Sequence, residues 1–259
     1  MTRRLPLAVA AALSVAALSC TRHPPAVIPA PASPAATAPA AAPTPVPVRL
    51  PNRLSDSEFW QLITDLSEAD GFFRSDNLLS NEIWLQRVIP DLTRDAQPGR
   101  VYMGVGPEQN FTYISALRPA MVFIVDVRHG NLDLHLLYKA LFEMSADRVE
   151  FVSRLFSRTR PDGVAASSSA REIFDALSGT PPDDDLFARN LHEVEDRLTN
   201  KHGFPLTPDD TQWLEYVYGA FSKYGTGLTY WMSGGRFGRN APSYADLMVA
   251  TDEAGVPRS

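Results

Sequence analysis

The sequence predicts an α/β fold with a parallel sheet, on the basis of one segment, residues 100–128. This segment contains two short apolar runs typical of buried strands, Val101 to Val105 and Met121 to Val125, with glycines at the end of the first and Asp126 after the second. Apolar residues at helical spacing lie between the two runs. This order of strand, glycine turn, helix, strand and acid is that of the first half of a Rossmann-like nucleotide-binding unit.

The connecting helix is expected to open at Pro107 and to end at Arg118-Pro119. Proline suits the first helical turn because its missing N–H has no helical partner there. In this fold ligands bind at the carboxyl ends of the strands, so the candidate ligand-binding residues lie in the glycine loop and just after the second strand. They are Gly104, Gly106, Glu108, Gln109, Asn110, Asp126 and Arg128.

Each polar candidate has a structural alternative. The charge of Glu108 in the first helical turn disfavours a phosphate ligand and favours a cationic one, but the same charge also complements the helix dipole without any ligand. An acid such as Asp126 at the end of a buried strand is expected either to contact a ligand or to pair with a nearby arginine such as Arg128. Gln109 and Asn110 are candidates for the same cleft or for helix capping.

The rest of the domain is expected to be largely helical. Ser55 to Glu58 is a capping box that opens one helix, and Pro90 is expected to end a second helix over residues 81–88. Apolar periodicity predicts further helices at about 132–145, 149–156, 169–178, 184–202 and 208–224.

The helix over 132–145 carries a polar stripe, His135, Lys139 and Glu143, at successive helical turns. A lysine and a histidine in apolar surroundings suit acid–base chemistry. The alternative is an ion pair on one solvated edge of the helix.

A glycine-rich stretch, Gly225 to Gly238, comes late in the chain and includes a possible strand from Leu228 to Met232. Its Tyr230 and Trp231 are candidates for stacking against an aromatic ligand. The alternative is a structural loop whose aromatic rings lie in the core.

The N-terminus predicts export. Residues 1–20 contain two arginines, an apolar run and Cys20, which together resemble a secretory signal ending in a bacterial lipobox, in which the cysteine is lipidated. The alternative is an ordinary signal peptide cleaved nearby. Residues 21–51 consist mostly of alanine and proline and predict an extended linker. We therefore expect a lipid-anchored protein of the cell envelope that faces the periplasm or the exterior.

Composition limits the remaining possibilities. A chain of 259 residues with 44% hydrophobic residues can bury one sizeable core, which we assign to residues 52–259. The net charge of −6 argues against a nucleic acid partner. No metal site is predicted, because His129 and His135 do not share a helical face and no zinc-type set of cysteines is present.

Three strings, at residues 104–114, 123–128 and 135–143, resemble an uncharacterised bacterial family of hypothetical proteins. The resemblance extends over most of residues 54–258 and implies no activity. Members of that family continue past the pattern that here ends at Ser259 and add further α/β units. Because only two good strands are predicted, the resemblance implies a truncated chain whose sheet continues beyond this point.

The predicted fold also resembles that of S-adenosylmethionine-dependent methyltransferases. Gly104 and Gly106 match two glycines of that family's loop, and Asp126 matches its ribose-binding acid. Glu108 replaces the third glycine, and Tyr102 stands where an acid is usual. The resemblance implies a methyltransferase-type parallel sheet with added helices and S-adenosylmethionine as cofactor.

Two functions follow as hypotheses. The first is an exported lipoprotein with a methyltransferase-like site for a small-molecule ligand. The second is a non-enzymatic binding or interaction lipoprotein of the cell envelope that uses a Rossmann-like scaffold, because fold alone does not fix function.

Overall fold

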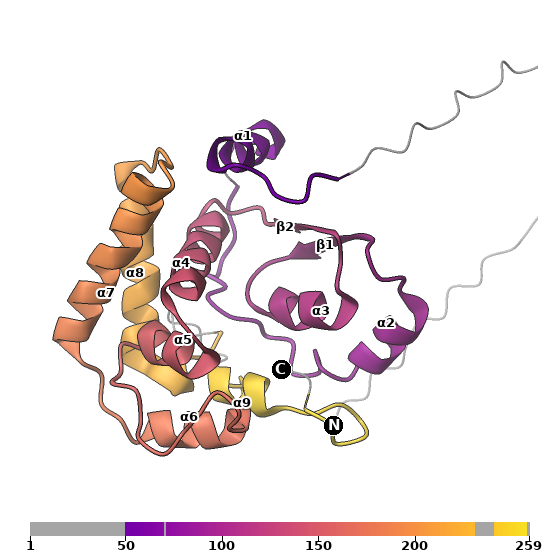
Figure 1. Cartoon of the computed structure of the whole chain (residues 1–259), viewed down its shortest axis with the longest axis vertical. Coiled ribbons are helices and arrows are strands. Elements are labelled where there is room, and N and C mark those ends of the chain that lie inside the picture. The colour runs from indigo at the N-terminus through magenta and orange to yellow at the C-terminus, as the bar shows by residue number, and fades with distance from the viewer. Residues whose placement is uncertain (1–49, 70, 231–240, 258–259) are drawn as a thin grey trace, which may run out of the picture. The chain divides into compact units, whose positions relative to one another are not determined.

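The computed structural model describes residues 50–69, 71–230 and 241–257, all within one compact unit, Val48–Ser259 (Figure 1). The predicted signal peptide with Cys20, nearly all of the linker, and residues 231–240 lie outside the described residues. No helix in the described part is long and apolar enough to cross a membrane.

The protein is mixed α/β, with many helices and a small parallel sheet. Strand β1 (Val101–Val105) pairs in parallel with β2 (Met121–Val125), and Val101 lies opposite Met121 in the register. Helix α3 (Gln109–Leu117) connects them and ends at Arg118, whose backbone is left-handed with φ of 50°. The strands and the crossover helix are confirmed, but α3 begins at Gln109 and not at Pro107, which lies in the bend before it. The described residues show two strands in one sheet, so the larger methyltransferase-type sheet is not seen there.

Eight further α-helices are described. They are α1 (Asp56–Leu66), α2 (Ile89–Asp95), α4 (Gly130–Met144), α5 (Arg148–Leu155), α6 (Ala170–Ser178), α7 (Asp184–Asp196), α8 (Pro208–Tyr224) and α9 (Tyr244–Val249). A π turn, Arg197–Lys201, extends α7, and a 3-10 turn, Gly225–Gly227, follows α8.

The prediction of a helix over residues 81–88 is wrong. Turns occupy residues 83–88, and α2 begins at Ile89. Pro90 lies in the first turn of α2, where a missing N–H has no consequence, so this proline starts a helix instead of ending one. The capping box at Ser55 and Glu58 is confirmed, with the Glu58 backbone N–H donating to Ser55 Oγ over 3.2 Å.

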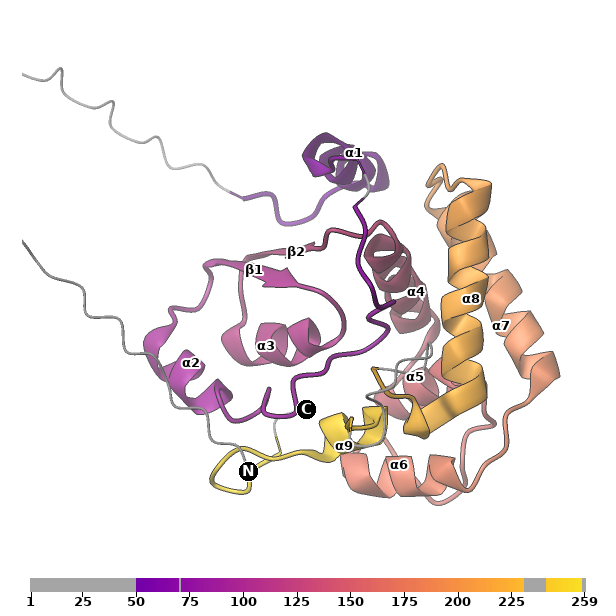
Figure 2. The ribbon, with the colours of Figure 1, turned by 180° about the vertical axis from the view of Figure 1, so that it is seen from behind.

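The core is centred on α4. Ten of its residues are buried, and it packs against α8, α5 and α7. Figure 2 shows α4, α8 and α7 lying side by side. Fully buried Tyr138 on α4 contacts the rings of Phe111 on α3 and Phe221 on α8. This ring cluster joins the strand unit to the helical layer.

One face of the sheet is open in the described structure. Val101, Met103 and Val105 alternate along β1 and are 53%, 70% and 64% exposed. The intervening Tyr102 and Gly104 face α3. Parallel sheets normally carry cover on both faces, and α3 covers one of them here.

The segment expected as a strand at Leu228 to Met232 forms a single antiparallel bridge, between Thr229 and Ser243, in the described residues. Tyr230 is half-buried and packs against the core, as in the structural alternative for this stretch. Trp231, Met232 and the later glycines fall outside the described residues.

Candidate functional site

The carboxyl ends of β1 and β2 bring Gly106, Gln109 and Asp126 together. Gly106 has φ of 80°, a conformation that favours glycine. A Cβ atom placed on Gly106 would lie 3.5 Å from Nε2 of Gln109 and 4.0 Å from Oδ2 of Asp126. Parallel strands end at the same edge of a sheet, so the glycine loop and the acid after β2 meet there.

Gly104 has a different role. A Cβ atom at this position would lie 1.9 Å from Oδ1 of Asn110 and within 2.8 Å of the Tyr102 ring and hydroxyl. The Tyr102 hydroxyl donates to Asn110 Oδ1 over 2.7 Å. The missing side chain of Gly104 therefore makes room for two side chains of the protein itself.

Asn110 fixes the glycine loop through hydrogen bonds to its backbone. Its Nδ2 donates to the carbonyl oxygens of Val105, Gly106 and Pro107 over 3.1, 3.1 and 2.8 Å. The residue is 1% exposed. This arrangement is neither of the two expected roles: α3 has no side-chain cap at its N-terminus, and the Asn110 amide group instead fixes the turn that leads into α3.

Glu108 points into the protein. It is 3% exposed, and its carboxylate accepts the Ser80 backbone N–H over 3.0 and 3.2 Å. Burial raises the pKa of Glu108 to about 7, and the hydrogen bond from Ser80 opposes that change. Glu108 thus ties the glycine loop to the segment before α2.

Asp126 and Arg128 form the ion pair that was one of the two expected roles. Oδ1 of Asp126 accepts the Arg128 backbone N–H over 3.0 Å and its Nε over 3.1 Å, and Oδ2 accepts Nη2 over 3.1 Å. Arg128 also donates to the Asp76 carbonyl oxygen. The two paired side chains are only 6% and 11% exposed. A carboxylate oxygen has two lone pairs, so Asp126 keeps capacity for a further donor.

Gln109 lies beside this pair with one free acceptor. Its Nε2 donates to the Val105 carbonyl oxygen over 2.9 Å. Its Oε1 is buried and has no hydrogen-bond partner among the described residues. That oxygen suits a hydroxyl or amino group of a ligand.

His135 belongs to the same site, a contact that sequence reasoning missed. Its Nε2 donates to the Gly106 carbonyl oxygen over 2.9 Å. Burial lowers the pKa of His135, while the Gly106 carbonyl and the charge of Asp126 oppose this effect. The three residues of the polar stripe on α4 therefore have different roles. His135 bonds to the glycine loop, and Lys139 forms an ion pair with Glu143 over 2.5 Å.

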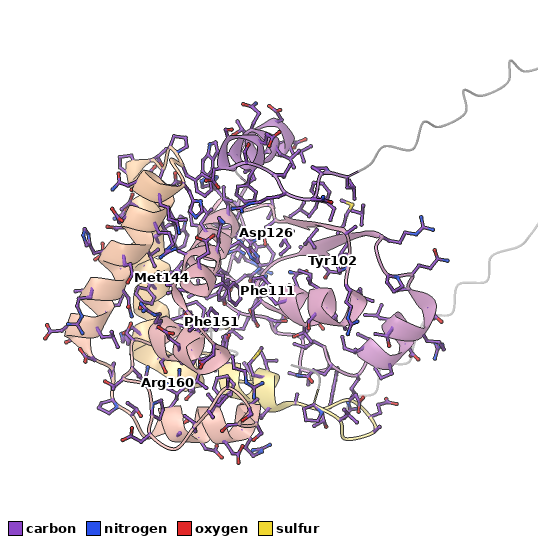
Figure 3. The ribbon with its side chains drawn as sticks, viewed as in Figure 1. Tyr102, Phe111, Asp126, Met144, Phe151 and Arg160 are labelled. Atoms are coloured by element: carbon purple, nitrogen blue, oxygen red, sulfur yellow. The ribbon has the colours of Figure 1, made fainter. Side chains whose placement is uncertain are left out.

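Phe111 holds α4 in this position. Its ring meets those of His135, Tyr138 and Phe142 edge-on, with centroids 5.6, 5.3 and 5.3 Å away. Figure 3 shows Phe111 where α3 approaches α4, with Asp126 at the end of β2 nearby. An edge-to-face contact is worth about 0.5–1.5 kcal/mol beyond the area it buries.

The sequence of this region is shared with other proteins. Residues 78–202 match DUF7790, a domain of unknown function. A comparison with curated proteins gives no match. The DUF7790 segment contains all seven candidate residues, as well as His135, and agrees with the expected uncharacterised family.

A separate hollow of about 560 Å³ lies along α8, partly outside the DUF7790 segment. Leu78, Phe187 and residues of α8 between Gln212 and Tyr224 line it. None of the seven candidate residues contributes to its lining. We therefore assign the candidate site from the chemistry of the glycine loop, and not from this hollow.

Proposed function

We propose that the protein is an exported lipoprotein with a methyltransferase-like ligand site at the carboxyl ends of β1 and β2. The observation that carries the proposal is the meeting of Gly106 and Asp126 at that edge, with 4.0 Å between the Cβ position of the glycine and Oδ2 of the acid. A glycine with φ of 80° lets a ligand approach the backbone closely, and an acid at this place suits ribose hydroxyls.

The side chains favour a cationic nucleoside over a dinucleotide. Asp126 and Gln109 offer oxygen acceptors, which suit hydroxyl and amino groups or a positive charge and do not suit a phosphate. Glu108 does not contribute to this preference, because its carboxyl group is buried and bonded to Ser80. S-adenosylmethionine carries a ribose, an adenine and a positive sulfonium, and it has no phosphate. When bound, it would supply the methyl group for a transfer reaction.

The fit to S-adenosylmethionine is partial. Gly106, Gln109 and Asp126 can hold the ligand. His135 fixes the loop through the hydrogen bond from its Nε2 to the Gly106 carbonyl oxygen. Gly104 and Asn110 are occupied with the protein's own contacts. We therefore place the ligand against the Gly106 side of the loop.

The alternative function is a non-enzymatic binding or interaction lipoprotein. It is favoured by the double hydrogen bonding between Asp126 and Arg128, and by the packing of Tyr102 and Asn110 against Gly104. These contacts give two of the methyltransferase-like positions a purely structural purpose.

Isothermal titration of the full chain in detergent with S-adenosylmethionine and its demethylated product separates the two functions. The proposal expects a dissociation constant on the order of 10–100 μM, in the usual range for enzyme substrates. Circular dichroism confirms folding in the same sample. Absence of heat with a folded protein rejects the ligand site and leaves the interaction function.

Three variants locate the site. Asp126→Asn removes the charge and is expected to weaken binding by about 10–100-fold, the equivalent of one hydrogen bond to a charged group. Arg128→Met breaks the same ion pair but keeps the carboxylate, so binding should persist. Asp91→Asn in the exposed Asp91–Arg94 pair is the matched control. Equal losses in the first two variants would attribute the effect to the ion pair and not to ligand contact.

A further inference from the structure

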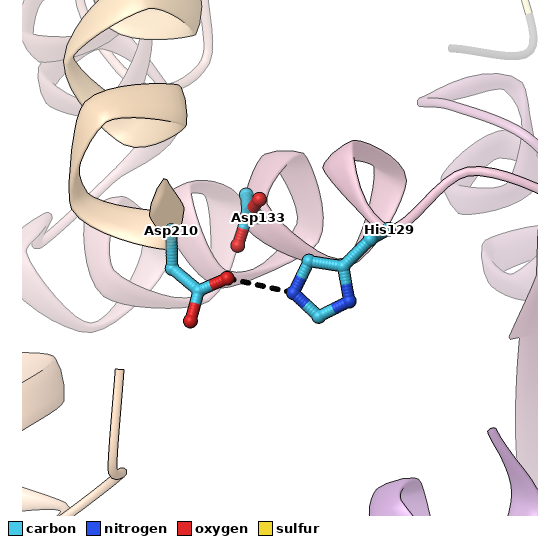
Figure 4. A group of neighbouring side chains, drawn as sticks. All are labelled: His129, Asp133 and Asp210. Carbon is cyan, nitrogen blue, oxygen red and sulfur yellow. Dashed lines mark hydrogen bonds and ion pairs between the residues drawn. The ribbon is translucent and has the colours of Figure 1, made fainter. Parts of the chain in front are cut away.

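We propose that His129, Asp133 and Asp210 form a binding site for a divalent transition-metal cation such as Mn²⁺ or Zn²⁺. One nitrogen from the histidine and one oxygen from each aspartate all lie within 4.8 Å of one another (Figure 4). The inference goes beyond the proposed ligand site and does not depend on it.

The fold brings the three side chains together from two helices. His129 is the residue before α4, and Asp133 follows four positions later, on the same face of the helix. Asp210 lies in the first turn of α8, which packs against α4. Asp133 and Asp210 therefore lie on two helices that pack against each other, and His129 immediately precedes the first of them.

Burial and charge both favour a cation. Asp133 is 0% and Asp210 5% exposed, so both carboxyl groups are enclosed by the protein, and carboxylate oxygens are ligands that suit divalent cations. The His129 side chain is 47% exposed, which leaves an approach from solvent.

The distances suit insertion of an ion. Nε2 of His129 lies 2.7 Å from Oδ1 of Asp210, and a proton now joins the two atoms. Ligand atoms about 2.0–2.2 Å from a metal ion lie roughly 3 Å apart when adjacent, so an ion can replace that proton, which is released to solvent. The Asp133 oxygen must then move closer by about 1–2 Å.

The other oxygen of Asp210 is already held in place. Oδ2 accepts the Thr207 backbone N–H over 2.7 Å as part of the capping box of α8. Such a second contact orients a ligating carboxylate. The nearby cation Arg128 is engaged by Asp126 and by the Asp76 carbonyl oxygen, so its charge is already balanced.

The donor set indicates the class of metal. One imidazole nitrogen suits transition metals, and two carboxylates suit harder ions such as Mn²⁺. His202 is a useful contrast because it also has two carboxylate partners, Asp56 at 2.9 Å and Glu143 at 2.8 Å. These partners bond to different ring nitrogens, which point in different directions, so they cannot share one ion with the imidazole.

Titration of the full chain, first treated with a chelator, with MnCl₂ and separately with ZnCl₂ tests the proposal. We expect one ion per chain and, for Mn²⁺, a nitrogen coupling in pulsed electron paramagnetic resonance. His129→Ala should lose that coupling and weaken binding at least tenfold, and Asp133→Asn should also weaken it. His202→Ala is the matched control and should bind as the wild type does.

His129 is half-exposed, so its replacement leaves the core in place even if Asp133→Asn fails to fold. The proposal is overturned by wild-type protein that binds neither ion at millimolar concentration, or by His129→Ala protein that binds as well as His202→Ala. Asp126→Asn should leave metal binding unchanged, so failure of the nucleoside site and failure of the metal site give different results.

Discussion

Replacing Glu108 by glutamine should remove a pH-dependent weakness from the fold. The Glu108 carboxyl group is 3% exposed, and burial raises its pKa from 4.5 to about 7. An acid whose pKa is higher in the folded than in the unfolded state stabilises the protein fully only below the unfolded value. That stability is lost as the pH rises through about 7, where the folded state must ionise a buried group.

The size of the effect follows from the two pKa values. A change from 4.5 to about 7 corresponds to about 3 kcal/mol in the free energy of unfolding, since each pKa unit is equivalent to about 1.4 kcal/mol. Glutamine has nearly the same shape and keeps an oxygen that can accept the Ser80 N–H, but it carries no charge. Glu108→Gln should therefore be more stable than the wild type by up to about 3 kcal/mol above pH 8, and close to it at pH 4.5.

Urea denaturation followed by circular dichroism, at intervals from pH 4.5 to 8.5, measures this difference. Glu172→Gln is the matched control, because hydrogen bonds from the Ser169 backbone and hydroxyl lower the pKa of the exposed Glu172. Its contribution has the opposite sign and is present at neutral pH and lost in acid. A stability difference between Glu108→Gln and wild type that does not change with pH would refute the buried-acid reasoning.

Three further predictions concern other parts of the chain. Gly104→Ala should destabilise the fold by about 1–3 kcal/mol in a urea melt, since its Cβ would lie 1.9 Å from Asn110 Oδ1, and an unchanged midpoint would contradict this packing. Arg158→Met should lower the free energy of unfolding by about 3 kcal/mol, because the buried guanidinium donates to three backbone carbonyl oxygens that would lose their partner. A loss below about 1 kcal/mol would show that water replaces the guanidinium as the donor. Labelling of cells with a radioactive fatty acid should mark the wild type and not Cys20→Ala, and label that persists in the variant would reject the lipid anchor.

The strand unit could be predicted from the sequence because its signals are local. Val101–Val105 and Met121–Val125 are strands with the predicted bounds, and Arg118 ends α3 as expected. Short apolar runs, glycines and a proline decide such structure without reference to distant parts of the chain. Pro90 shows the limit of this reasoning, because proline is compatible both with the end of one helix and with the start of another.

Side-chain direction around the glycine loop could not be predicted. The position of Glu108 predicts a charge that faces a ligand or complements the helix dipole, yet its carboxylate accepts the backbone N–H of Ser80, 28 residues earlier in the chain. Helical spacing groups His135 with Lys139, yet His135 bonds to Gly106, 29 residues away. These contacts depend on how α4 and the segment before α2 pack against the loop. Periodicity within one element does not contain that information.

The candidate metal cluster was not predicted, for a more specific reason. The two histidines that are close in sequence, His129 and His135, are six residues apart and do not share a helical face. The spacing of four between His129 and Asp133 is visible in the sequence and is the signal that could have indicated a site. The third member, Asp210, lies 81 residues from His129, and only the packing of α8 on α4 brings it near.

The short loop after β2 serves both proposed sites, and this arrangement makes them separable. Asp126 faces the glycine loop, whereas His129, three residues later, opens α4 and faces α8. Of the other residues in the two proposed sites, Asp133 and Asp210 come from helices, Gly106 comes from the turn after β1, and Gln109 begins α3. A change at Asp133 can therefore alter the metal site without touching Gly106 or Gln109. If Asp133→Asn weakened both metal and nucleoside binding in a folded protein, the two sites would be a single site that includes the loop after β2.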